Sequence, residues 1–181
     1  MKRAIFIVTI LSLCVAMAPN VWAQAHSNPS GSSNVGLLML YEKDSNFEIV
    51  KGGGMGRLKF DNSAMTFNYK FNGHDLQADT EYCLIYYADP WPGDGHDHST
   101  GALIGSGLSD ADGVLGIKGS IELHSDLPNP KDANWPYGAK IWLVPCSDYD
   151  ATNHQMKAWN PSTYLFEFKL ITYDDTGVPP S

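Results

Sequence analysis

Apolar and polar residues alternate along two neighbouring stretches of the chain. In 57–60 and again in 65–72, every second residue is apolar and the residues between are mostly basic or polar. Successive side chains of a strand point to opposite faces, so this period of two predicts strands with one face turned towards a core. The dipeptide Asn72-Gly73 has turn chemistry and is expected to close the second of these strands.

Further apolar stretches of strand length are separated by Gly, Pro, Asn or Asp. They predict strands at 35–43, 46–50, 81–88, 103–108, 114–123, 139–144 and 164–173. The 3.6-residue period of an amphipathic helix is not sustained beyond about two turns anywhere, and 155–159 favours a single helical turn. Because parallel neighbours need long crossover connections, these strands are expected to pair antiparallel. We predict an all-β fold, an antiparallel two-sheet β-sandwich that is immunoglobulin-like or related, with a β-barrel as the alternative.

The predicted strand 81–88 is apolar on both faces. Tyr82 and Tyr86 share one face with a leucine, and the other face carries Cys83 and Tyr87. A strand with two apolar faces is expected near the centre of its sheet. We expect at least one of its tyrosine rows to reach solvent or a partner.

The first 23 residues have the features of a signal peptide. Lys2 and Arg3 give a positive start, an apolar run of about 13 residues follows, and small residues precede a cleavage site after Ala23. The apolar run is shorter than the roughly 20 residues needed to span a bilayer, so no integral membrane span is expected after cleavage. A second small-x-small site ends at Ala25, and the sequence leaves the choice between the two sites open.

The expected domain organisation follows from this leader. Residues 1–23 form the signal peptide, 24–34 a flexible leader, 35–176 the β-sandwich domain and 177–181 a C-terminal tail. The leader segment is rich in Ser, Asn and Gly and has too little apolar surface to order itself. We therefore expect a protein that is secreted, either extracellular or in the cell envelope.

The chain is acidic, and its charge narrows the range of partners. Its net charge of -8 becomes -10 when Lys2 and Arg3 leave with the signal peptide. Such a charge repels phosphate backbones, so nucleic acid is excluded as an expected partner. A protein or glycan surface partner is compatible with the composition, and the oligomeric state is left open.

Two cysteines, Cys83 and Cys146, remain after the signal peptide. An even pair in an oxidising compartment predicts a disulfide. Closing a loop of about 63 residues stabilises a fold by about 4 kcal/mol in the chain-entropy model. The alternative is two separate thiols, because the alternation through Lys140 and Trp142 places Cys146 on the presumed outer face.

The loop 89–101 holds the candidate metal ligands. His96 and His98 flank an aspartate, and Asp94 comes just before them. Imidazole and carboxylate groups together suit zinc, copper or manganese. A divalent metal is therefore the one cofactor considered, and the favoured alternative is a solvated polar hairpin loop with no cofactor.

Four aromatic residues lie in loops beside prolines. They are Trp91, Trp135, Tyr137 and Trp159. Exposed flat rings stack on sugar faces, which makes these residues the candidate carbohydrate-binding surface. The favoured alternative is that the rings plug the open ends of the sandwich, where burial stabilises by about 2 to 3 kcal/mol per ring.

No combination of residues favours catalysis. A Ser, His and acid arrangement, a nucleophile elbow and paired carboxylates are all missing from the sequence pattern. The run from Asp110 to Gly113 resembles the opening of a calcium loop, but a tight turn with Gly113 at positive φ is the simpler interpretation. The protein is therefore expected not to be an enzyme.

Four segments of the chain have a distinctive sequence. They are YCLIYYADPWPG at 82–93, the stretch 105–113 followed by GSIEL, GAKIWLVP at 138–145, and WNPSTYLFEFKLITYDDT at 159–176. These segments resemble a group of secreted prokaryotic β-sandwich proteins, many of them archaeal. The resemblance covers about 100 residues and implies a sandwich of immunoglobulin-like or related type. It implies no activity and no catalytic residues.

Together these observations predict a secreted, non-enzymatic β-sandwich that acts through its surface as a binding or structural module. One alternative is a carbohydrate-binding module that uses Trp91, Trp135, Tyr137 or Trp159. The other is a metal-binding protein that uses Asp94, His96 and His98. The ligand and the strand order are left open by the sequence.

Overall fold

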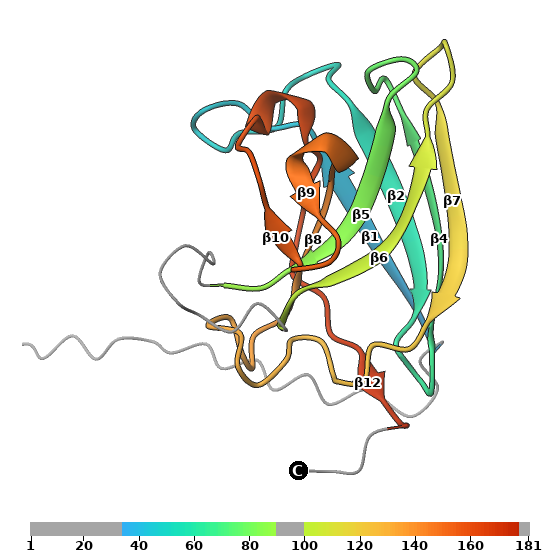
Figure 1. Cartoon of the computed structure of the whole chain (residues 1–181), viewed down its shortest axis with the longest axis vertical. Helices are drawn as coiled ribbons and strands as arrows, with labels where there is room; N and C mark the ends of the chain where they lie inside the picture. Colours follow the sequence, from blue (N-terminus) through green and yellow to red (C-terminus); the bar gives the residue numbers. More distant parts are fainter. Residues whose placement is uncertain (1–33, 90–99, 178–181) are drawn as a thin grey trace, which may run out of the picture. The chain divides into compact units, whose positions relative to one another are not determined.

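Regular structure in this protein is almost entirely β (Figure 1). The computed structural model describes residues 34–89 and 100–177. The strands are β1 (Val35–Tyr41), β2 (Met55–Asp61), β3 (Ser63–Ala64), β4 (Phe67–His74), β5 (Glu81–Tyr87), β6 (Ala102–Leu108), β7 (Leu115–Ile121), β8 (Lys140–Pro145), β9 (Tyr149–Asp150), β10 (Gln155–Met156), β11 (Phe166–Glu167) and β12 (Asp174–Asp175). Short 3-10 turns, η2 (Cys146–Asp148) and η3 (Pro161–Thr163), follow β8 and β10.

Two main sheets form the layers of the sandwich. The five-stranded sheet has the order β11-β1-β2-β4-β7, and the three-stranded sheet has the order β6-β5-β8. All pairs within these two sheets are antiparallel. No sheet closes on itself in the described part of the chain, so the all-β sandwich is confirmed and the β-barrel alternative is wrong.

The main core lies between the two sheets. Inward residues of the five-stranded sheet, such as Leu58 and Phe71, are fully buried, as is Leu84 of the three-stranded sheet. The residues between them on β2 and β4 are exposed, which confirms the alternating pattern of the sequence. Burying a side chain of this size contributes about 1.5 to 3 kcal/mol, so this face supplies much of the driving force for folding.

A second core covers the outer face of the three-stranded sheet. Cys83 and Ile85 of β5 and Trp142 and Val144 of β8 pack there against the segment that contains β9, β10 and η3. This cover explains why β5 is apolar on both faces. The strand is central in its sheet, as predicted.

The expected exposure of a tyrosine row on β5 is wrong for the face of Tyr82 and Tyr86, which are buried in the main core at 1% and 2% exposure. Tyr87, on the other face, is half-buried and stacks on Trp142 with ring centroids 3.9 Å apart. Both faces of the sheet are covered, and Tyr87 at the end of the strand keeps partial contact with solvent.

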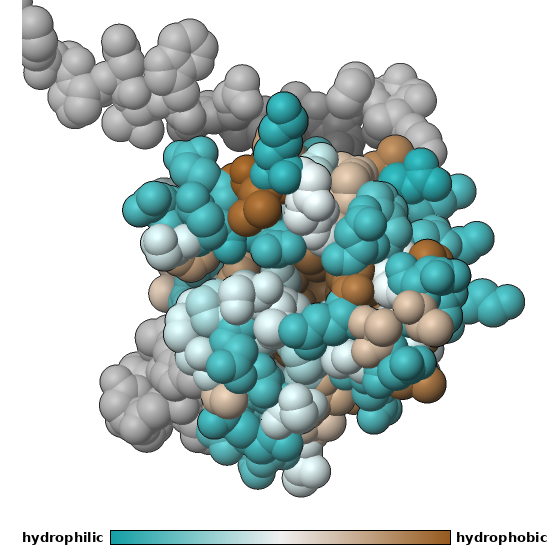
Figure 2. All heavy atoms as spheres, turned by 90° about the horizontal axis from the view of Figure 1, so that it is seen from above, coloured by the Kyte–Doolittle hydropathy of each residue, from teal (hydrophilic) through white to brown (hydrophobic). Residues whose placement is uncertain are grey.

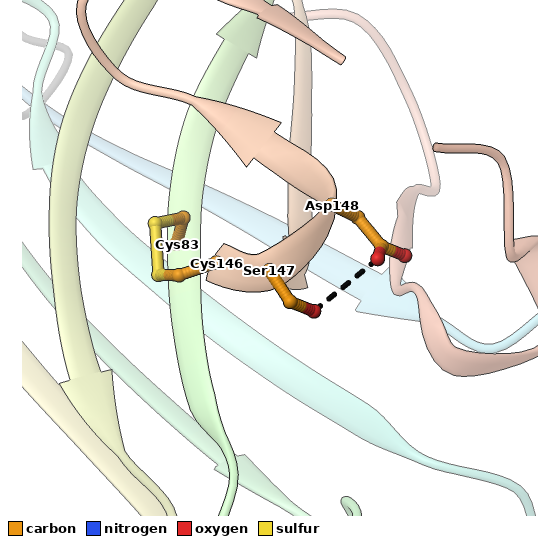
Figure 3. The surroundings of a disulfide bond; sticks show 4 residues. All are labelled: Cys83, Cys146, Ser147 and Asp148. Atoms are coloured by element: carbon orange, nitrogen blue, oxygen red, sulfur yellow. Dashed lines mark hydrogen bonds between the residues drawn. A yellow bond between two sulfur atoms is a disulfide. The ribbon is translucent and has the colours of Figure 1, made fainter. Parts of the chain in front are cut away.

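A disulfide joins Cys83 to Cys146, as predicted (Figure 3). Cys83 lies on β5 and Cys146 opens η2, directly after β8 has paired with β5. The face shared with Trp142 is indeed an outer face of the sheet, but the second core buries it. The next residues continue the turn, where the Ser147 hydroxyl donates to Oδ1 of Asp148 at 3.2 Å.

The predicted turn at Asn72-Gly73 is wrong, because β4 continues through His74. Gly73 is buried and lies opposite Gly56 of β2. The Phe71 ring lies over Gly56, where an added Cβ would come within 2.2 Å of the ring. These glycines therefore provide room for an aromatic side chain, and the chain turns after β4 instead.

The predicted strand 164–173 is divided between the two sheets. Leu165 bridges to Leu143 of β8, and β11 then pairs with β1. Further along, Ile171 bridges to Ala139. Because this segment alternates between sheets, its apolar residues serve both cores and do not form one continuous strand.

The helical turn expected at 155–159 is also wrong, since β10 lies there and pairs with β9.

The turns after β4 and β6 meet at one end of the sandwich. The amide of Leu76 donates to the carbonyl of Gly113 at 3.1 Å, and Gly113 has a φ of 71°. The Oδ1 of Asp110 accepts from the amides of Asp112 and Val114, which confirms the tight turn. Figure 2 looks onto this end and shows apolar residues in separate groups among mainly hydrophilic ones.

Across the described ranges, the structure contains no helix that is both long and apolar enough to span a membrane.

The double variant Cys83→Ala/Cys146→Ala is expected to lose about 2 to 4 kcal/mol of unfolding free energy, because its unfolded chain regains the freedom of the opened loop. Denaturant unfolding of wild type and variant measures the difference. Reduced wild-type protein should show a similar loss. Detection of two free thiols in the unreduced, denatured protein would contradict the disulfide.

Candidate functional site

Two candidate sugar-binding rings stand exposed on the loop 129–138. Trp135 is 53% exposed and Tyr137 is 82% exposed. Pro136 between them is also exposed. The prediction that these rings plug an end of the sandwich is therefore wrong for Trp135 and Tyr137. We call this segment the aromatic loop.

Successive tight turns shape the aromatic loop. The amide of Asp132 donates to the carbonyl of Asn129 at 2.9 Å, and the amide of Trp135 donates to the carbonyl of Asp132 at 2.9 Å. The amide of Tyr137 donates to the carbonyl of Asn134 at 2.7 Å. These bonds fix the backbone on which both rings are carried.

Asp132 anchors the aromatic loop to the core. Its side chain is 3% exposed, and its Oδ2 accepts from the Tyr86 hydroxyl at 2.6 Å. Its Oδ1 accepts from the amide and the side-chain nitrogen of Asn134 at 2.8 and 2.9 Å. Burial, and then this hydrogen bond to a carboxylate, raise the pKa of the Tyr86 phenol above its usual range. A buried carboxylate with several donors is held in one position, so the loop has a rigid base.

Asp89, at the end of β5, joins the same polar network. It forms an ion pair with Lys140 of β8 and accepts from the side-chain nitrogen of Asn134 at 2.8 Å. Its backbone carbonyl accepts from the amide of Ala133 at 3.0 Å. Because Lys140 and Asp89 are both about one quarter exposed, this pair is partly shielded from solvent. Asp89 therefore serves to tie β5, β8 and the aromatic loop together.

The predicted metal ligands Asp94, His96 and His98 lie outside the described residues, as does Trp91. Within 34–89 and 100–177, no three side chains of His, Cys, Asp or Glu come together in a way that could hold a metal ion. The metal-binding hypothesis therefore stays a prediction.

Trp159 lies on a different segment from the aromatic loop. It packs on Trp142 and Tyr164, with ring centroids at 5.9 and 5.7 Å, and is 48% exposed. Tyr164 is fully buried, and its hydroxyl donates to Oδ2 of Asp148 at 2.8 Å. Trp159 is thus partly a cover for the second core, and it shares no loop with Trp135.

Glu167 of β11 is half-buried, and its carboxyl group lies beside the second core. Its Oε2 and the Nε1 of Trp142 are both buried; their geometry is not that of a good hydrogen bond, but Trp142 is close enough to lower the pKa of Glu167. Desolvation raises the pKa of Glu167 from 4.5 to about 7, and the nearby ammonium group of Lys43 opposes this rise. Lys43 donates to the backbone carbonyl of Glu167 at 3.0 Å.

Asp132, Lys140 and Glu167 were not identified from the sequence. Asp132 lies in a polar stretch with the composition of any solvated loop. The partner that makes it important, Tyr86, is 46 residues away along the chain. The only local sign of a role for Asp132 is its position close to loop aromatics, and that position does not show that its side chain is buried.

No protein-family model, no curated protein and no solved structure matches this chain.

Asp132→Ala is expected to lower the unfolding free energy by about 1 to 3 kcal/mol, because it leaves the buried Tyr86 hydroxyl without its acceptor. Asp132→Asn keeps one oxygen acceptor and should lose less. Thermal or denaturant unfolding measures both, with Asp112→Ala in an exposed turn as the matched control. Equal stability of Asp132→Ala and the control would contradict the anchoring role.

Glu167 should make stability depend on pH. Because its folded pKa is raised, its contribution to unfolding free energy is complete below about pH 4.5 and is lost as pH rises through about 7. Wild type should lose about 1 to 3 kcal/mol relative to Glu167→Gln between about pH 5 and about pH 8. Denaturant unfolding of both proteins at the two pH values measures this difference. An unfolding free energy of wild type that stays constant or rises with pH, relative to that of Glu167→Gln, would contradict it.

Proposed function

We propose that this chain is an exported, non-enzymatic β-sandwich of immunoglobulin-like or related type that binds a glycan through its aromatic loop. The observation that carries the proposal is the exposure of Trp135 and Tyr137 on a loop with a rigid, buried base. Export rests on the signal-peptide features of residues 1–23. The disulfide suits the same oxidising compartment.

Exposed rings on a fixed loop have the properties that sugar recognition needs. An indole or phenol ring offers a flat apolar face, and the Tyr137 hydroxyl adds a hydrogen-bonding group. A preformed loop reduces the ordering entropy that binding would otherwise cost. In Trp135 and Tyr137 this chain offers two such rings two residues apart.

The size of the surface favours a glycan over a protein partner. A stable protein interface buries about 800 Å² on each partner, usually around a central cluster of buried anchors. The aromatic loop instead presents a short exposed run from Trp135 to Tyr137, flanked by the buried Asp132 and Gly138. One or two sugar rings would cover this run.

Trp135→Ala and Tyr137→Ala are each expected to weaken glycan binding by about tenfold or more, equivalent to about 1.4 kcal/mol. A glycan array with purified, disulfide-bonded protein identifies the ligand, and isothermal titration calorimetry measures the affinities. Phe168→Ala, which removes an exposed ring from the opposite sheet, is the matched control and should bind as wild type does. Array-wide absence of binding, or unchanged affinity in both loop variants, would refute the proposal.

A further inference from the structure

The outer face of the five-stranded sheet carries a row of basic side chains. Lys59 of β2 lies directly opposite Lys70 of β4, and Lys70 lies directly opposite Lys118 of β7. Arg57 lies two residues from Lys59 on the same face of β2. All four are exposed, and β2, β4 and β7 lie side by side (Figure 1). We call these four residues the basic row.

Among the described residues, no ion pair joins an acidic side chain to the basic row, although Asp61 lies two residues from Lys59 on the same face of β2. The cross-strand neighbours of the row on the same face are uncharged: Leu37 lies opposite Lys59, and Asn72 lies opposite Arg57. In the part of the chain that the structure describes, the ion pairs involve other residues. Asp61 at the end of β2 accepts a hydrogen bond from Asn68 of β4. The four charges therefore face solvent together.

Repulsion between the like charges of the basic row makes folding less favourable. Neighbouring strands are about 4.8 Å apart, and like charges directly opposite each other across strands are destabilising. The chain has 12 lysines and arginines against 20 acidic residues, yet four of its basic residues meet on one sheet face. A concentrated positive face on an acidic protein is complementary to an anionic ligand.

We propose that the outer face of the five-stranded sheet binds an acidic polysaccharide, one that carries carboxylate or sulfate groups, across the strands along the basic row. The lysines of β2, β4 and β7 present a charge at each strand, so a linear chain of repeated anionic groups meets them in turn. At the β1 end of the row, Leu37 is 56% exposed and offers an apolar surface to a sugar ring. This site is separate from the aromatic loop and does not depend on it.

A single polysaccharide chain fits the charge distribution of this face better than an anionic lipid bilayer or a DNA duplex does. The rest of the protein is strongly acidic, and charges interact within a Debye length of about 8 Å at physiological salt. A broad anionic surface would also meet carboxylates at the rim, such as Asp61. A single polysaccharide chain that follows the lysines across the strands covers fewer of these carboxylates.

Binding of heparin, as a sulfated probe, and of polygalacturonate, as a carboxylated probe, tests the proposal, with neutral dextran for comparison. Wild type should bind at least one of the two acidic probes, more weakly as salt rises, and should not bind dextran. The variant Lys59→Gln/Lys70→Gln/Lys118→Gln should bind about tenfold or more weakly. Its melting temperature should equal or exceed that of wild type, because it loses like-charge repulsion.

The matched control changes the same charge elsewhere. Lys51→Gln/Lys157→Gln/Lys169→Gln replaces three exposed lysines outside both the basic row and the aromatic loop and should retain wild-type affinity. Equal losses in the two triple variants would refute the basic row as the site. If the protein bound phosphatidylglycerol vesicles or DNA but neither heparin nor polygalacturonate, an acidic polysaccharide would be refuted as the ligand. Trp135→Ala should bind the acidic probe as wild type does, because the aromatic loop is not part of this site.

Discussion

Strand β5 must be buried on both of its faces, and the sandwich is organised around that constraint. One face carries Tyr82 and Tyr86 into the core between the sheets, and the other carries Cys83 and Ile85 into the second core. A sheet with two apolar faces is stable only when both are covered. The five-stranded sheet covers one face, and the segment with β9, β10 and η3 covers the other. The disulfide at Cys83 joins the strand to the start of that segment.

The same constraint gives the aromatic loop its fixed position. Tyr86 is buried because it belongs to β5, and its hydroxyl must find an acceptor inside the protein. Asp132 supplies that acceptor, and Asn134 and Asp89 complete the network. The hydroxyl of Tyr86 thereby fixes the base of the aromatic loop, and the rings of Trp135 and Tyr137 face solvent.

Two surfaces with different chemistry result from this architecture. The aromatic loop presents uncharged rings near the start of β8, whereas the basic row presents charge on the outer face of the other sheet. The protein thus offers a stacking surface and an electrostatic surface on separate elements, and one does not restrict the chemistry of the other. We propose glycans as the ligands of both surfaces, neutral for the first and acidic for the second.

The sequence alone determined most of the strands, the two-sheet class and the cysteine pair, because alternation and composition are local properties. It did not locate the turn after β4. The dipeptide Asn72-Gly73 has turn chemistry, but Gly73 lies inside the strand, where its missing side chain leaves room for the Phe71 ring. Nor did the sequence show that 164–173 serves both sheets. Lys59, Lys70 and Lys118 are far apart in the chain, and only strand register places them opposite one another. Burial of Asp132 likewise depends on a partner distant in sequence, so pairing and packing, which are properties of the tertiary structure, decided both surfaces.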